Sequence, residues 1–365
     1  MPVMEDIKSV DLFVSGRLCL FGEHTDWAGE HKGRSESIVE GRTIVVGTQE
    51  GLFATAKPLK EKVLRITTTD NHGEKTGPAE FTLEPSELLA VARSGGFFSY
   101  VAGTAYRLCV AHELEGGLEL NNHTTTLPMS KGLSSSAAIC VMVARAFNRV
   151  YNLRLSTRGE MEFAYLGEIT TPSKCGRMDQ ACAYGSVPVL MTFDGDILTV
   201  DRLQLAVPLH LVLVDLKASK DTTTILKCLQ QAYPHPASDL HEGLHRLLGP
   251  INHRITSEAL QAMATGDVSQ LGRLMVAAQQ LFDQLAGPLC PEQLTAPVLH
   301  KVLSYPAIQE LVWGGKGVGS QGDGTAQLLC RGSEEQAKVC AILSADLGLE
   351  CMPLTVTTPR HGDHK

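Results

Sequence analysis

The chain has 365 residues, 43% of them hydrophobic and 20% charged, with a formal net charge of −8 at pH 7. Its length favours two domains, and its composition is typical of a soluble globular enzyme and excludes a largely disordered chain. The acidic charge argues against a dedicated nucleic-acid-binding protein, which would present a basic face. It still permits an anionic ligand at a locally positive site.

Ten cysteines are scattered along the chain without a C-x-x-C pair, a distribution that indicates reduced thiols rather than a disulfide framework. Residues 1–13 carry acidic side chains early and lack the apolar core of a secretory signal. No uncharged apolar run is long enough to span a membrane. We expect a cytoplasmic enzyme, monomeric or homodimeric, that binds neither nucleic acid nor membrane.

The first part of the chain alternates strand-like segments with turns. Residues of high β-propensity predict strands over 11–21, 42–48, 52–56 and 63–69. Glycine-containing turns are predicted at 71–73 and 76–78. Further along, the pattern predicts a helix over 99–109, a strand over 118–121, a helix from the serines near 135 to about 151, a helix over 160–168 and a strand over 187–193.

The second part is rich in predicted helices. After a turn at 194–196 and a buried strand over 208–215, helices are predicted over 218–232, 239–248, 257–263, 267–285 and 294–304. The chain then reads as a strand, a helix and a strand over 326–330, 334–347 and 351–358. Without any internal repeat, this order predicts a mixed α+β fold in two lobes, with the boundary within 195–208.

Residues 129–138, MSKGLSSSAA, are the most informative segment, and they lead into an apolar run of small residues. The pattern predicts a loop that becomes a helix N-terminus, where unpaired N–H groups and the helix dipole favour a polyanion such as a phosphate chain. The three serine hydroxyls can reach a phosphate oxygen or its Mg²⁺. The alternative is an ordinary serine-capped buried helix.

A second polar cluster follows the first predicted strand, which carries Arg17. A glycine turn then presents Glu23, His24 and Asp26 within four residues, a group that can bind several hydroxyls at once. One alternative is a solvated turn after an edge strand. Another is a metal site that includes His24, Asp26 and His31, although the spacing fits no standard zinc pattern.

Two more segments carry candidate chemistry. Asp179 lies in the segment CGRMDQ, residues 175–180; it is a candidate general base for a hydroxyl proton, or else a helix cap. Gly317, Gly319 and Gly322 form a G-x-G-x-x-G pattern, but a dinucleotide-binding fold needs this pattern after its first strand and before a helix. A tight glycine loop that approaches a ligand through its backbone is the favoured interpretation.

Taken together, these segments resemble the GHMP kinase superfamily of galactokinase, homoserine kinase, mevalonate kinase and phosphomevalonate kinase. Residues 16–26, GRLCLFGEHTD, are similar to the galactokinase sugar signature. Residues 128–138 are similar to the phosphate loop P-x-x-x-G-L-S-S-S-A, and 175–180 to the galactokinase segment C-G-x-M-D-Q. Residues 314–324 stand in the place of the third glycine-rich motif.

The resemblance implies a two-lobed GHMP kinase fold. Its N-terminal lobe, over 1–200, would resemble ribosomal protein S5 domain 2 and would carry the phosphate loop and the acceptor motif. Its C-terminal lobe, over 201–365, would be ferredoxin-like. ATP and the acceptor would bind in the cleft between the lobes.

The resemblance also implies roles for individual residues. Asp179 would take the proton of the acceptor hydroxyl or orient it, with Arg17 nearby, and Glu23, His24 and Asp26 would hold the sugar hydroxyls. Mg²⁺ would be held by Glu168, with Glu162 as the fallback, and by Ser136 or Ser135. The ATP phosphates would be bound by the loop residues Lys131, Gly132, Leu133, Ser134, Ser135 and Ser136.

The chain departs from the galactokinase pattern in three places. Residues 27–32 read WAGEHK where galactokinases continue GEHTDY-N-x-G, and 170–174 do not match the usual spacing before C-G-x-M-D-Q. The third motif carries Lys316, Gln321 and Asp323 where galactokinases are more apolar. Galactose is therefore not favoured over other sugars.

The expected function is an ATP- and Mg²⁺-dependent kinase that phosphorylates a hydroxyl, in our reading the anomeric one, of a free monosaccharide such as a hexose or a uronic acid. One alternative is a GHMP kinase for a non-sugar alcohol, either mevalonate or a polyol. Another is a non-catalytic, sugar-sensing regulator with a kinase-like fold. Lys32, Arg34 or Arg42 could bind the carboxylate of a uronic acid, or could simply form a solvated basic loop.

Overall fold

A computed structural model of the protein describes residues 9–127, 133–173 and 175–357. The chain divides into two compact units: unit 1 comprises Met1–Arg17 and Gly47–Gly185, and unit 2 comprises Leu18–Val46 and Ser186–Lys365. Strands β1 (Val10–Phe21) and β2 (Gly41–Leu59) each contribute residues to both units. The predicted division into lobes over 1–200 and 201–365 stays a prediction.

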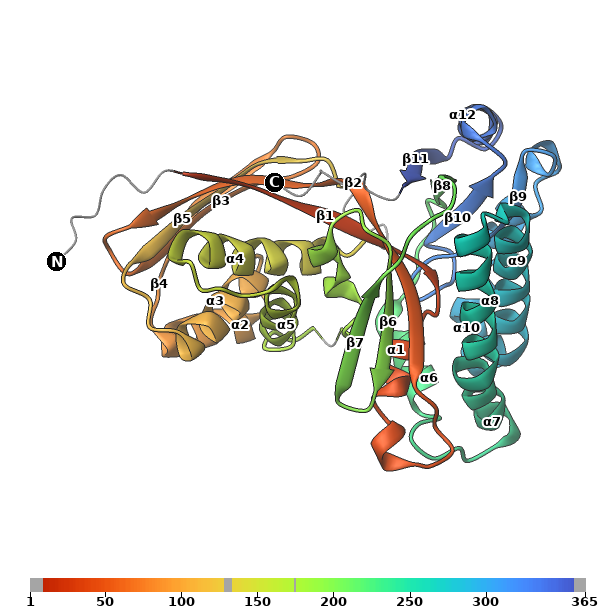
Figure 1. Ribbon diagram of the computed structural model, residues 1–365, viewed down its shortest axis with the longest axis horizontal. Helices are drawn as coiled ribbons and strands as arrows, with labels where there is room; N and C mark the ends of the chain where they lie inside the picture. The colour runs from red at the N-terminus through yellow and green to blue at the C-terminus, as the bar shows by residue number, and fades with distance from the viewer. Residues whose placement is uncertain (1–8, 128–132, 174, 358–365) are drawn as a thin grey trace. The chain divides into compact units, whose positions relative to one another are not determined.

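Unit 1 combines a sheet with a group of packed helices (Figure 1). Its strands run in the order β4-β3-β5-β2, with β1 also paired to β2; the strand bounds are β3 (Val63–Thr69), β4 (Lys75–Thr82) and β5 (Gly117–Thr125). The helices are α2 (Pro85–Ser94), α3 (Ser99–Ala111), α4 (Ser135–Tyr151) and α5 (Thr157–Glu168). A Cβ atom on Gly103 of α3 would lie 2.4 Å from the carbonyl oxygen of Gly167 on α5, so these helices pack backbone against backbone.

Unit 2 contains a hairpin and an antiparallel sheet. The hairpin of β6 (Val189–Asp194) and β7 (Ile197–Arg202) pairs with the first residues of β2. The sheet has the order β11-β8-β10-β9, with β8 (Leu209–Asp215), β9 (Val312–Gly317), β10 (Thr325–Cys330) and β11 (Glu350–Val356). Counted along the chain this is the order 4-1-3-2 of a ferredoxin-like βαββαβ unit.

The helices of unit 2 supply much of its apolar interior. Their bounds are α1 (Thr25–Gly29), α6 (Thr222–Gln230), α7 (Asp239–Arg246), α8 (Asn252–Thr265), α9 (Val268–Leu285), α10 (Pro291–Leu294), α11 (Pro297–Leu303) and α12 (Ser333–Leu347). One buried cluster joins Trp27 of α1 to residues of α6, α7 and α9, including Leu229, Leu244 and Phe282. The short helix α1, which carries Asp26, is thereby anchored in the core of its unit.

The predicted α+β fold class is confirmed, and the differences lie in single elements. The segments 42–48 and 52–56 belong to one strand, β2, because Gly51 lets the backbone of β1 approach: a Cβ there would lie 2.2 Å from the carbonyl oxygen of Val14. The predicted turn at 76–78 lies within β4. Helices α1, α2 and α10 and strands β4 and β9 were not predicted.

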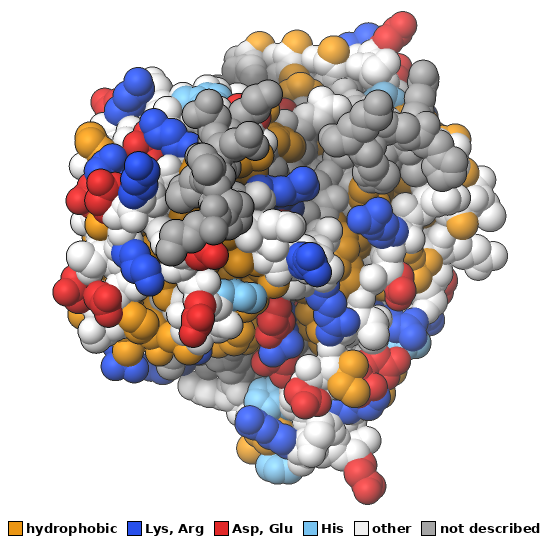
Figure 2. Space-filling view, turned by 60° about the vertical axis from the view of Figure 1, so that its left-hand side comes forward, with side chains coloured by type: hydrophobic (Ala, Val, Ile, Leu, Met, Phe, Trp, Pro, Cys, Tyr) orange, Lys and Arg blue, Asp and Glu red, His pale blue; other side chains and the backbone are white. Residues whose placement is uncertain are grey.

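No helix in the part of the chain that the structure describes is long and apolar enough to cross a membrane. On the face shown in Figure 2, acidic and basic side chains are interspersed. The absence of a nucleic-acid partner stays a prediction.

Candidate active site

Strand β1 lies against the serine-rich segment in unit 1. The backbone N–H of Arg17 donates to the carbonyl oxygen of Leu133, at 3.2 Å. A Cβ on Gly16 would lie 2.3 Å from Cδ1 of Leu127 and 3.3 Å from the same carbonyl oxygen, so a glycine is required for this approach. Lys131 and Gly132, two predicted ATP-binding residues, lie outside the described residues.

Helix α4 begins at Ser135, the second of three half-buried serines. Ser134 has the left-handed conformation (φ 56°, ψ 54°), and its side chain makes no capping hydrogen bond among the described residues. The serine-capped alternative is therefore wrong for this residue. The first-turn N–H groups of this helix of 17 residues have no partner within the helix itself and can bind an anion.

Asp179 is the first residue of a 3-10 helix, Asp179–Tyr184, in unit 1. The guanidinium of Arg17 donates from Nη2 to Oδ1 of Asp179, across 162 positions of sequence. The N-cap of this helix is Met178 rather than Asp179, which disfavours the interpretation of Asp179 as a cap. The arginine contacts one carboxylate oxygen, and the Asp179 side chain as a whole is 23% exposed.

Glu168, the last residue of α5, lies beside Asp179 in the interior of unit 1. Its exposed fraction is 1%, and Nε2 of Gln180 donates to its Oε2 at 2.7 Å. Burial is the larger cause that raises its pKa to about 7; the neighbouring Asp179 carboxylate adds to it, and hydrogen bonds with Ser136, Gln180 and Cys175 oppose it. The predicted residues Ser136, Glu168 and Asp179 are thus brought together.

These donors fit a hard divalent cation. Mg²⁺ prefers carboxylate and hydroxyl oxygens, and a buried carboxyl with a raised pKa beside a second carboxylate is a site where a cation would be favourable. Glu168 and Ser136 are the residues that would hold it. The fallback ligand, Glu162, instead forms an ion pair with Arg177 at 3.7 Å.

The acceptor motif lies in unit 2, in the turn between β1 and α1. Gly22 has φ +95°, and a Cβ there would lie 2.0 Å from the carbonyl oxygen of Arg42. Thr25 fixes the turn by donating from Oγ1 to the carbonyl oxygen of Gly22 at 2.8 Å. The three predicted hydroxyl-binding residues are largely buried rather than solvated, with exposed fractions of 8% for Glu23, 4% for His24 and 5% for Asp26.

His24 is held as a neutral ring. The indole N–H of Trp27 donates to Nδ1 of His24 at 3.2 Å, so the ring proton lies on Nε2, and the ring stacks on Phe282. Burial lowers the pKa of His24 to about 4; the backbone of Ser320 opposes this shift, and the charges of Lys220 and Lys316 add to it.

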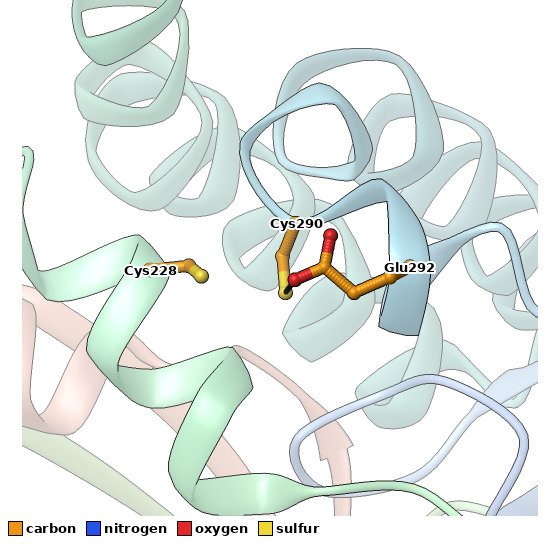
Figure 3. A group of neighbouring side chains, drawn as sticks. All are labelled: Cys228, Cys290 and Glu292. Atoms are coloured by element: carbon orange, nitrogen blue, oxygen red, sulfur yellow. Dashed lines mark hydrogen bonds between the residues drawn. The ribbon is translucent and has the colours of Figure 1, made fainter.

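The metal alternative for this motif finds no support. The one cluster of metal-ligating side chains among the described residues does not include His24, Asp26 or His31. It consists of Cys228 on α6 with Cys290 and Glu292 at the start of α10, whose side chains point toward one another (Figure 3). We assign this cluster to packing, because Cys290 is buried in the apolar cluster of unit 2 and Cys228 packs against it.

Glu23 has a partner that the motif alone did not reveal. Nζ of Lys316, on β9, donates to Oε1 of Glu23 and, at 3.1 Å, to the carbonyl oxygen of Gly317. Lys316 has an exposed fraction of 2%. The sequence marked Lys316 as a departure from the galactokinase pattern but gave no sign that it would pair with a residue 293 positions away.

This ion pair lies at a pocket formed within unit 2, a solvent-open cavity with a volume of about 40 Å³. We call it the unit 2 pocket. Its lining combines the pair with amide side chains and with apolar side chains: Phe21, Gly22, Glu23, Leu247, Leu248, Asn252, Ile255, Ala278, Gln279, Phe282, Lys316 and Gln321.

Two of the three cations proposed to bind a carboxylate are already engaged by acids. Nζ of Lys32 lies 2.8 Å from Asp194 and 3.4 Å from Glu40, and the guanidinium of Arg42 lies 3.5 Å from Glu40. Hydrogen bonds and the charge of Lys32 lower the pKa of Glu40 to about 2. Arg34 is exposed.

The third glycine-rich segment joins two strands rather than a strand and a helix. Gly317 ends β9, and β10 begins at Thr325, so the dinucleotide-binding alternative is not supported. The N–H of Gly317 donates to Oε1 of Gln279 at 2.7 Å. Asp323 accepts a hydrogen bond from the backbone N–H of Leu299 at 2.8 Å, which assigns it to the support of α11.

Comparison with known proteins agrees with the fold and motifs. Residues 99–186 match the family model of the GHMP kinases N terminal domain. A galactokinase from Roseiflexus sp. (strain RS-1) is 29% identical over 294 residues, covering 71% of this chain and 69% of that protein.

Solved structures show the same fold at low identity. Lactococcus lactis galactokinase complexed with galactose superposes with a TM-score of 0.69 at 19% identity, covering 96% of this chain and 94% of that chain. Methanococcus jannaschii mevalonate kinase gives a TM-score of 0.70 at 17% identity, covering 97% and 100%.

Proposed function

We propose that the chain is a galactokinase-like member of the GHMP kinase superfamily, as its family-model match, relatives and fold support, and that it transfers the γ-phosphate of ATP to a hydroxyl of a free monosaccharide. The observation that carries the proposal lies within unit 1: an uncapped N-terminus of α4, with Arg17, Asp179, Glu168 and Ser136 close to it. Phosphoryl transfer needs mainly positioning and stabilisation of phosphate charge, and this group is suited to both.

The residues of unit 1 divide the chemistry between them. The free N–H groups of α4 and the serine hydroxyls bind the phosphates through hydrogen bonds and the helix dipole. Asp179 accepts the proton of the attacking hydroxyl, and Arg17 fixes the orientation of its carboxylate. Glu168 and Ser136 would hold Mg²⁺, which neutralises phosphate charge when it is bound.

The acceptor is assigned to the motif that follows Arg17 in the chain. Glu23, His24 and Asp26 are carried by the turn after β1 and α1, and their buried polar atoms would bind ring hydroxyls. We propose the anomeric hydroxyl as the phosphate acceptor, by analogy with the sugar signature in this segment. The ten free thiols suit a reducing compartment, and we propose the cytoplasm.

The test is a screen for ADP release with free hexoses, pentoses, uronic acids, amino sugars, inositols and mevalonate, with and without Mg²⁺. We expect turnover with a monosaccharide, and the position of the phosphate on the product is then determined by NMR. Turnover with mevalonate or an inositol alone would contradict the proposal. Sugar binding without turnover of any acceptor would instead favour a sugar-sensing regulator.

A further inference from the structure

Glu23 and Lys316 form a buried ion pair at the unit 2 pocket. Removing two charges from water is costly, and leaving either one without its partner costs more than the pair gains. The ammonium of Lys316 donates to Glu23 and to the carbonyl oxygen of Gly317, so at most one of its three N–H groups remains for a ligand. Glu23, likewise, keeps only part of its carboxylate for hydrogen bonds to a ligand.

The remaining lining of the pocket carries no formal charge. The leucine, isoleucine and phenylalanine side chains contribute apolar walls, and Asn252, Gln279 and Gln321 contribute amides. Both amide atoms of Gln279 are hydrogen-bonded within the protein, and the amide nitrogens of Asn252 and Gln321 donate to backbone carbonyl oxygens. Oε1 of Gln321 is buried and has no hydrogen-bond partner among the described residues, which suits an incoming hydroxyl donor. Lys220 is nearby, since its charge acts on His24, but it donates to the carbonyl oxygen of Val318 and does not line the pocket.

We propose that Lys316 is a specificity-determining residue: by neutralising Glu23 it makes the unit 2 pocket select an uncharged, polyhydroxylated acceptor over the carboxylate form of the same sugar. The proposal rests on the proposed function, since it concerns the acceptor of a sugar kinase. A carboxylate in this pocket would have to compete with Glu23 for Lys316 or remain desolvated without a free cation. A hydroxyl needs only Oε1 of Gln321 and the hydrogen-bonding capacity that remains on Glu23 and Lys316.

The first experiment compares a neutral hexose with its hexuronate, using the hexose that gives the highest kcat/KM in the screen. Turnover and equilibrium binding are both measured, the latter by calorimetry. We expect wild type to favour the neutral sugar by about 10- to 100-fold, the scale of a few kcal/mol for an unpaired buried charge. Equal or better use of the hexuronate, or failure of every sugar to bind, would overturn the proposal.

The second experiment removes the carboxylate that pairs with the ammonium group of Lys316. E23Q leaves Lys316 without its acidic partner, so we expect the preference for the neutral sugar to fall by about tenfold or more through gained hexuronate affinity. The double variant E23Q/K316Q restores the neutral pocket and should restore the preference. An unchanged ratio in folded E23Q would overturn the assignment.

Two further variants keep the test decisive. If thermal denaturation shows that E23Q is unfolded, K316M supplies the opposite test: it leaves Glu23 without a counter-charge and should strengthen the rejection of hexuronate. K32M is the matched control, because Lys32 is also paired with acids but lies outside the pocket. A larger change of the ratio in K32M than in K316M or E23Q would contradict the proposal.

These experiments separate the two proposals. Selective binding of neutral sugars without ADP release would contradict the kinase assignment and leave the role of Lys316 intact. Turnover of both sugars at equal efficiency would retain the kinase assignment and remove that role.

Discussion

Asp179 and Glu168 are neighbouring carboxyl groups with different surroundings. Asp179 is partly exposed and contacts the guanidinium of Arg17, whereas Glu168 is fully buried and hydrogen-bonded by Gln180. Two adjacent carboxyl groups with different partners are suited to different tasks. We assign proton transfer to Asp179 and metal binding to Glu168, and each assignment can be tested by a substitution that keeps the size of the side chain.

Substitution of Asp179 by Asn is expected to lower kcat by about 10²–10⁴-fold, the usual contribution of a general base. The affinity for ATP should change little, because the helix N-terminus that binds the phosphates is intact. Steady-state kinetics and nucleotide titration by calorimetry check both quantities. A kcat within threefold of wild type would remove Asp179 from proton transfer.

Substitution of Glu168 by Gln is expected to raise the Mg²⁺ concentration needed for half-maximal activity by about tenfold or more, the scale on which metal sites lose affinity when their partners are removed. Glu162→Gln is the matched control, since Glu162 is on the same helix and pairs with Arg177. Activity is measured across a Mg²⁺ titration at fixed ATP. If Glu162→Gln raises the required Mg²⁺ concentration and Glu168→Gln does not, the metal would be assigned to Glu162.

His24 predicts a pH dependence of folding stability. Its pKa is lowered from 6.5 to about 4 in the folded protein, so between these values the unfolded chain binds more protons. The contribution of His24 to the free energy of unfolding is fully present above pH 6.5 and is lost as the pH falls toward 4. This contribution is on the order of 3 kcal/mol.

The measurement is the free energy of unfolding in urea over that pH range, for wild type and His24→Gln. The difference between the two proteins isolates His24, because Glu168, whose pKa is raised to about 7, contributes with the opposite sign in both. We expect the difference in the free energy of unfolding between wild type and His24→Gln to decrease as the pH falls from 6.5 toward 4. Parallel pH profiles would show that His24 does not titrate as described.

At the scale of elements, the turn between β1 and α1 depends on one glycine. Gly22 has a positive φ and a backbone carbonyl where a Cβ would be, so Gly22→Ala is expected to destabilise the protein by about 2–4 kcal/mol. Gly33→Ala is the control, because a Cβ there meets nothing within 4 Å. Urea denaturation of both variants checks the prediction, and equal midpoints would contradict it.

The secondary-structure elements differ in how well they could be predicted from the sequence. Long periodic segments such as α4, α5 and α9 were predicted with small errors, because their apolar pattern follows from the helix they form. The short helix α1 could not be predicted, since it is fixed by Trp27 packing in the core of unit 2. Strand β9 is glycine-rich and reads as a loop; its backbone pairing with β10 makes it a strand.

The candidate site was predictable where residue type and local spacing carry the signal. Ser136, Asp179 and Glu23 each stand in a recognisable motif. The contacts between Arg17 and Asp179 and between Glu23 and Lys316 join positions 162 and 293 apart. No local pattern encodes such pairs, so only the folded chain reveals them.

At the scale of the whole molecule, the proposed nucleotide and acceptor residues belong to different units. Helix α4, for which we propose phosphate binding, and Asp179 are in unit 1, and Glu23, His24 and Asp26 are in unit 2. This separation predicts that each ligand alone protects a different set of backbone amides, since binding suppresses local opening.

Hydrogen exchange measured by mass spectrometry tests this separation. An unreactive ATP analogue with Mg²⁺ should slow exchange at the start of α4, and the acceptor sugar alone should slow it around Gly22 and Lys316. Asp194 and its neighbours at the β6–β7 turn serve as an internal reference, because they belong to neither site. Protection of both regions by the nucleotide alone would contradict the assignment.

The buried pair of Glu23 and Lys316 restricts which substitutions this protein can accept during evolution. A mutation at either position alone strands a charge in the interior, at a cost of about 3–5 kcal/mol, which is comparable to much of the stability of a typical domain. Descendants of this chain should therefore keep both residues or replace both. A change of acceptor specificity at this pocket would require substitution of both residues. We therefore expect positions 23 and 316 to covary among the nearest relatives of this protein.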